Sequence, residues 1–152
     1  MKVEKDFEDL LRLFNKHKVK YCIVGAYAVA FYCIPRYTKD MDILVEPKLE
    51  NGVKIVKALN EFGFKSLGLT PNDFTKERQI IQLGYEPVRI DLLTSLPGLT
   101  FAKVWKNKKL GIYGKQKVFF ISRDDLIETK KKTKRKQDFA DLELLLKTKK
   151  KK

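Results

Sequence analysis

The strand-like stretch DMDILV constrains the fold more strongly than any other part of the chain. Successive side chains of a β-strand point to opposite faces, so Met41, Ile43 and Val45 would share one apolar face. Asp40 and Asp42 would then share the other face. The apolar face suits a buried sheet, whereas the acidic face needs a positive partner to be stable there.

A second stretch, VRIDLL, repeats this alternation later in the chain. Val88, Ile90 and Leu92 would share one face, with Arg89 and Asp91 on the other. If the two strands are neighbours, three carboxylates converge on one face, and like charges disfavour their joint ionisation. A divalent cation is the usual compensation, and carboxylates without histidine or cysteine suit Mg²⁺.

Two such ions can align an attacking hydroxyl with phosphorus and stabilise a leaving pyrophosphate, so the spacing suggests metal-dependent phosphoryl or nucleotidyl transfer. Acids at strand ends also form turns or pair with arginine, and a D-x-D pair alone favours that structural role.

The turn before this strand adds a second feature. Residues Tyr21–Val24 read as a short strand that stops at Gly25 and Ala26, where an apolar helix begins. Glycine lets a ligand approach the backbone, and a helix N-terminus offers free N–H donors to phosphate. A tight strand-to-helix turn would need the same glycine, so both interpretations stay open.

Apolar periodicity predicts helices over about residues 4–18 and 49–62. The segments RQIIQLG and VRIDLLT read as strands, TFAKVW as a short helix and GIYGKQKVFFIS as a strand pair. A helical pattern then runs from residue 123 to 146, with the lysine-rich stretch 130–136 as a candidate interruption. We expect one α+β domain over residues 1–146 and a disordered lysine-rich tail over 147–152.

Charge and composition narrow the function classes. With 33 Lys and Arg against 19 Asp and Glu, the net charge of +14 favours an anionic partner. No apolar run approaches the roughly 20 residues of a membrane span, and the start lacks a signal-peptide core, so we expect a cytoplasmic protein without membrane contact. Cys22 and Cys33 have no metal-site spacing, and the single histidine, His17, argues against a histidine-dependent triad.

Taken together, "VGAYAVAFYCIPRYTKDMDILV" followed by "RIDLLTSLPG" resembles the nucleotidyltransferase superfamily related to DNA polymerase beta. The likeness is to its small stand-alone members of the minimal or AbiEii type, and it covers residues 21–45 and 84–98. The segment "LIETKKKTKRKQDFADLELL" resembles their C-terminal helix. The resemblance implies a nucleotidyltransferase fold, with a mixed β-sheet flanked by helices and a long C-terminal helix.

The resemblance also implies the roles of individual residues. Asp40, Asp42 and Asp91 would be the catalytic residues and would bind Mg²⁺ or Mn²⁺, as two ions. Asp91 would also help to deprotonate the acceptor hydroxyl. Gly25 and Ala26 would form the turn that cradles the phosphates of the nucleoside triphosphate (NTP).

Further phosphate contacts are implied on either side of this core motif. Arg36 and Thr38 stand where the family often has R-x-T-x-D, and Lys130 is the candidate phosphate contact from the C-terminal segment. Asp138 is expected to hold the C-terminal helix by an ion pair.

The implied activity is transfer of a nucleoside monophosphate from an NTP to a hydroxyl acceptor. The acceptor would be a protein, a tRNA or a small molecule, and the small relatives suggest a toxin–antitoxin or defence role. The alternative is a catalytically silent nucleic-acid-binding or regulatory module with the same fold, which the basic charge favours. Because the chain lacks the helical domain of larger transferases, a homo-oligomer or a partner protein would supply the acceptor surface.

Overall fold

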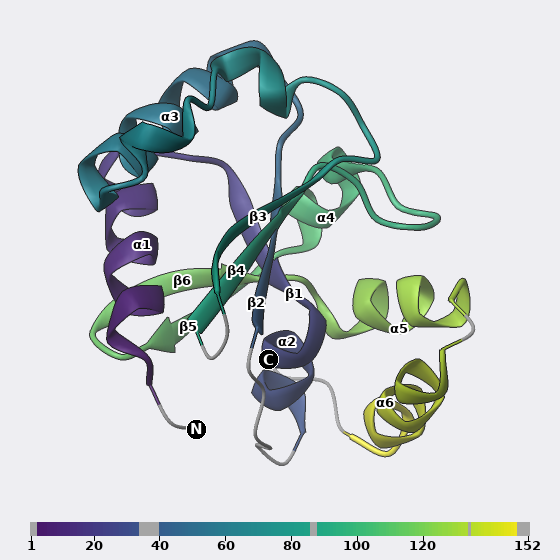
Figure 1. Cartoon of the computed structure of the whole chain (residues 1–152). Helices are drawn as coiled ribbons and strands as arrows, with labels where there is room; N and C mark the ends of the chain where they lie inside the picture. Colours follow the sequence, from purple (N-terminus) through teal and green to yellow (C-terminus); the bar gives the residue numbers. More distant parts are fainter. Residues whose placement is uncertain (1–2, 34–39, 86–87, 134, 149–152) are drawn as a thin grey trace.

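A computed structural model describes residues 3–33, 40–85, 88–133 and 135–148 of the chain (Figure 1). Arg36 and Thr38, the two phosphate contacts implied before the acidic strand, lie outside the described residues, as do the last four residues of the lysine-rich tail.

A mixed β-sheet forms the centre of the fold, and its strands come from both halves of the chain (Figure 1). Across the sheet the order is β3-β4-β2-β1-β6-β5. The pairs β2–β4 and β1–β6 are parallel, and the remaining pairs are antiparallel. The strands are β1 Tyr21–Val24, β2 Asp40–Val45, β3 Ile80–Tyr85, β4 Val88–Leu93, β5 Lys109–Tyr113 and β6 Gln116–Phe120.

Helices lie on both sides of this sheet (Figure 1). Helix α1 packs against α3 and β6, whereas α5 packs against α6 and α2. The helices are α1 Lys5–Lys16, α2 Gly25–Tyr32, α3 Leu49–Phe62, α4 Phe101–Asn107, α5 Arg123–Lys131 and α6 Lys136–Leu146, with short 3-10 turns at Lys65–Leu67 and Pro71–Phe74. No helix in the described ranges is long and apolar enough to cross a membrane.

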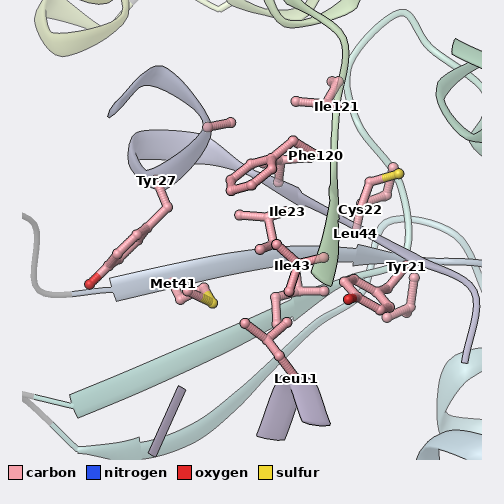
Figure 2. Packing of buried hydrophobic residues seen from close by; sticks show 14 of the residues in the cluster. Leu11, Tyr21, Cys22, Ile23, Tyr27, Met41, Ile43, Leu44, Phe120 and Ile121 are labelled. Atoms are coloured by element: carbon pink, nitrogen blue, oxygen red, sulfur yellow. The ribbon is translucent and has the colours of Figure 1, made fainter. Parts of the chain in front are cut away.

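The predicted apolar face of β2 is confirmed. Met41, Ile43 and Val45 are fully buried in the hydrophobic core. Figure 2 shows Met41 and Ile43 within one cluster that also contains Leu11 of α1 and Ile23 of β1. Burial of this face fixes the strand's orientation, because a shift by one residue would bring the aspartates into the core.

The C-terminal helical pattern forms two helices rather than one long helix. Helix α5 ends at Lys131, and α6 begins at Lys136, so the lysine-rich stretch does interrupt the pattern. In a continuous helix, Lys130 and Asp138 would be about 12 Å apart along the axis. In the structure, Lys130 Nζ lies 3.0 Å from Asp138 Oδ1. The break therefore lets α6 fold back and place its carboxylates on the lysine.

Candidate active site

Pairing of β2 with β4 brings the acidic positions together. The two strands are parallel, with Asp42 opposite Asp91 and Asp40 opposite Arg89. The three aspartates line one pocket of about 550 Å³. β2 and β4 are therefore neighbours, as predicted, and all three carboxylates lie on the same side of the sheet.

The strand-to-helix turn borders this pocket. Gly25 and Ala26 both line it, at the first turn of α2. Gly25 has φ +66°, and a Cβ atom at this position would collide with Asp42 Oδ2. Glycine is therefore required for two reasons at once, because it permits the left-handed turn and lets the backbone lie against the carboxylate.

Arg89 lies between two of the three aspartates. Its Nη2 atom is 2.7 Å from Asp40 Oδ2 and 3.2 Å from Asp91 Oδ2. The strand pattern predicts Arg89 on the same face as Asp91, but that pattern does not specify the contact with Asp40, which depends on the pairing of β2 with β4. Arg89 supplies the positive charge that the acidic face requires.

The pKa of Asp42, the third aspartate, depends on its surroundings. Burial raises the pKa of Asp42 to about 6, and the negative charges of Asp91 and Asp40 add to the rise. The positive charges of Arg89 and Lys130 oppose it. Asp91 Oδ1 is buried and accepts no hydrogen bond from any described residue. This part of the site therefore has unsatisfied capacity for a cation.

The residues present fit a hard divalent cation by their chemistry, since they offer carboxylate oxygens and a pocket open to phosphates. Within residues 3–33, 40–85, 88–133 and 135–148, no three His, Cys, Asp or Glu side chains are grouped closely enough to hold a metal ion. Arg89 occupies the space between Asp40 and Asp91, and each of these carboxylates has a second oxygen besides the one bound to the guanidinium. Three carboxylates line the pocket, and Arg89 lies between two of them.

Lys130 lines the same pocket from α5, and its ammonium is bound by two buried carboxylates of α6. Nζ lies 3.0 Å from Asp138 Oδ1 and 3.1 Å from Asp141 Oδ2, and all three side chains are at most 9% exposed. An ammonium has three donors, and these ion pairs use two of them. The expected ion pair of Asp138 is confirmed, and we call these three residues the lysine clamp.

Other groups complete the clamp and the pocket. Arg135 and Thr133 donate to Asp138 Oδ2, at 2.9 and 2.6 Å. Burial raises the pKa of Asp138, but hydrogen bonds from Arg135, Thr133 and Lys130 outweigh it and hold that pKa well below its usual range. The pocket is also lined by loop residues that carry no periodic sequence signal. These are Arg78, Ser95, Leu96 and Pro97.

No protein-family model matches the chain, and no curated protein matches it. Solved structures do share its fold. The lincosamide antibiotic adenylyltransferase LnuA, in its lincomycin-bound crystal structure, is 18% identical, with a TM-score of 0.62 over 95% of this chain and 96% of LnuA.

Two further structures show the same likeness. The antibiotic-resistance factor ANT(2'')-Ia is 11% identical, with a TM-score of 0.57 over 93% of this chain and 80% of its own. An antigenic nucleotidyltransferase-like protein from Paracoccidioides brasiliensis is 12% identical, with a TM-score of 0.56 over 95% of this chain and 77% of its own. The AbiEii-type assignment stays a prediction. The chain has the mixed α+β fold of nucleotidyltransferases.

Proposed function

We propose that the protein is a metal-dependent nucleotidyltransferase, which moves a nucleoside monophosphate from an NTP to a hydroxyl acceptor. The observation that carries the proposal is the register of β2 and β4, which sets Asp42 opposite Asp91 in a pocket bordered by the Gly25 turn. The shared fold with nucleotidyltransferases supports it.

Asp40, Asp42 and Asp91 would hold Mg²⁺ or Mn²⁺, as two ions. When bound, the metal supplies charge neutralisation for the triphosphate and stabilises the leaving pyrophosphate. Asp91 Oδ1, which is buried and accepts no hydrogen bond from any described residue, would be available to such an ion.

Phosphate binding would come from the backbone and from basic side chains. The N–H groups of Gly25 and Ala26 lie at the N-terminus of α2, where the helix dipole favours an anion. Lys130 would donate the remaining N–H of its ammonium to a phosphate oxygen, with the clamp carboxylates holding it in place. Arg36 and Thr38 remain proposed phosphate contacts outside the described residues.

The transfer itself is a displacement at the α-phosphorus. The acceptor hydroxyl oxygen forms a new bond to this phosphorus, the bond to the β-phosphate oxygen breaks, and pyrophosphate leaves. The hydroxyl proton passes to Asp91. Positioning and charge stabilisation account for the rate, as phosphoryl transfer generally requires.

Small molecules are the first acceptor class that we propose. LnuA binds lincomycin, and ANT(2'')-Ia is known in complex with adenylyl-2''-tobramycin. A protein side chain or a tRNA is the other acceptor class and would suit a cytoplasmic toxin–antitoxin or defence system. In that case a homo-oligomer or a partner protein would complete the acceptor surface.

The second candidate is a catalytically silent nucleic-acid-binding or regulatory module. Its supporting observation is Arg89, which would then be a permanent counter-ion of Asp40 and Asp91. Strong salt sensitivity of nucleic-acid binding without metal dependence would favour this alternative.

A transfer assay separates the two candidates. The protein is incubated with Mg²⁺ or Mn²⁺, with each α-labelled NTP in turn, and with cell extract divided into protein, RNA and small-molecule fractions. We expect label in one fraction with wild type, and none with Asp42→Asn or with a chelator. Label transfer that survives Asp42→Asn would contradict the proposed site.

A further inference from the structure

Arg89 contacts two aspartates through a single nitrogen. Nη2 lies 2.7 Å from Asp40 Oδ2 and 3.2 Å from Asp91 Oδ2. The contact is built into the sheet, because Arg89 is the cross-strand partner of Asp40 and stands two positions before Asp91 on the same strand. The Arg89 side chain therefore leaves these carboxylates only by a change of rotamer.

The guanidinium supplies these carboxylates with the positive charge that a bound cation would supply. A divalent ion and the Arg89 guanidinium cannot both lie close to the carboxylates of Asp40 and Asp91, since their positive charges repel each other. The Arg89 side chain is 27% exposed and faces a pocket of about 550 Å³, so it has room to swing away from the strand.

A displaced arginine would still have an anion within reach. The pocket that holds Arg89 is the one into which the proposed function places the triphosphate, and a guanidinium binds phosphate oxygens through paired N–H donors. Metal alone would displace Arg89 from the two carboxylates. Metal together with a nucleotide would replace the lost carboxylate contacts by phosphate contacts.

We propose that Arg89 is an internal counter-ion that competes with the metal for Asp40 and Asp91, and that it moves to the phosphates when the nucleotide binds. This inference rests on the proposed function and adds a coupling to it. Metal binds weakly by itself and tightly in the presence of nucleotide, and by linkage the nucleotide gains the same factor from the metal. Arg89 is a positioning residue in this scheme.

The test measures Mn²⁺ affinity by calorimetry in wild type, Arg89→Gln and Arg89→Lys, with and without a non-hydrolysable ATP analogue. Arg12→Gln is the matched control, because Arg12 is an exposed arginine of α1 and its loss changes the net charge equally. We expect Arg89→Gln to bind Mn²⁺ alone about tenfold more tightly than wild type, the order of effect for a partly exposed charge pair.

The same variant should lose most of the nucleotide's effect on Mn²⁺ affinity. Without Mn²⁺, Arg89→Gln should melt at a lower temperature than wild type, and Mn²⁺ should restore it, because the cation replaces the missing guanidinium. Arg89→Lys, which keeps the charge but not the fork, should lie between wild type and Arg89→Gln. It also serves as the test if Arg89→Gln does not fold.

Two negative results have different meanings. If wild type binds Mn²⁺ with the analogue but Arg89→Gln and Arg89→Lys show wild-type affinity for Mn²⁺ alone, the counter-ion inference is wrong and the proposed function stands. If wild type binds no Mn²⁺ even with the analogue, the proposed function itself fails, and the inference fails with it.

Discussion

Replacement of Lys130 by methionine tests whether the lysine clamp holds the C-terminal helices on the pocket. Methionine has a similar length but no charge, so Lys130→Met leaves Asp138 and Asp141 without the ammonium that lies 3.0 and 3.1 Å from them. Both carboxylates are at most 2% exposed and cannot gain water in exchange. Removal of one partner from a buried pair typically costs about 3–5 kcal/mol.

The lower end of that range applies here. Asp138 keeps its contacts with Arg135 and Thr133, and Asp141 keeps its hydrogen bond from Gln137. We therefore expect a loss of about 3 kcal/mol in the free energy of unfolding, which is about 6–12 °C in Tm for a domain of this size. Urea unfolding followed by far-UV circular dichroism gives the first quantity, and a thermal scan gives the second.

Lys131→Met is the matched control, since Lys131 is the exposed neighbour at the end of the same helix. This variant should stay within about 0.5 kcal/mol of wild type. A Lys130→Met protein as stable as the control would refute the clamp. If such a protein also lost nucleotide binding, Lys130 would be a phosphate contact alone.

Three further predictions follow from the same geometry. Gly25→Ala should lose about 1–3 kcal/mol more stability than Gly68→Ala in urea unfolding. The two glycines have nearly the same φ, of +66° and +65°, but only the Cβ at position 25 would meet another atom, Asp42 Oδ2. Equal losses would show that the turn is not packed against the carboxylate. The lowered pKa of Asp138 stabilises the fold above the ordinary pKa of 3.8, and this stability should be lost as the pH falls below that value toward the lower folded-state pKa. Acid titrations of stability should therefore be steeper below pH 4 in wild type than in Asp138→Asn, and parallel curves would contradict the assignment. Asp91→Asn should reduce turnover far more than Mn²⁺–nucleotide affinity, and an equal loss of both, measured by transfer assay and calorimetry, would remove its role as proton acceptor.

The sequence predicts those parts of the fold that depend on local periodicity. Alternation of apolar and acidic residues identified β2 and β4, and the helical spacing identified α1 and α3 with their bounds nearly as observed. The turn at Gly25 was predicted because a strand stops at this glycine and an apolar helix begins there, and the structure gives the glycine a φ of +66°. These features depend on a few consecutive residues.

Local sequence patterns did not predict the features that depend on pairing between distant segments. Arg89 could be placed on the acidic face, but its contact with Asp40 requires the register of two strands that are separated by more than 40 positions along the chain. Lys130 was expected to contact phosphate, and its engagement by Asp138 and Asp141 arises only because the chain reverses between α5 and α6. Arg78 and Ser95 come from loops, whose course has no periodic signal.

The most direct test of the site is a crystal structure of the protein with Mn²⁺ and a non-hydrolysable ATP analogue, examined by anomalous scattering at the manganese edge. We expect anomalous density bounded by the carboxylates of Asp40, Asp42 and Asp91, with the triphosphate beside Gly25 and the Arg89 guanidinium turned toward it. Bound nucleotide with no manganese among these carboxylates, and with Arg89 still between Asp40 and Asp91, would contradict the metal-dependent transferase.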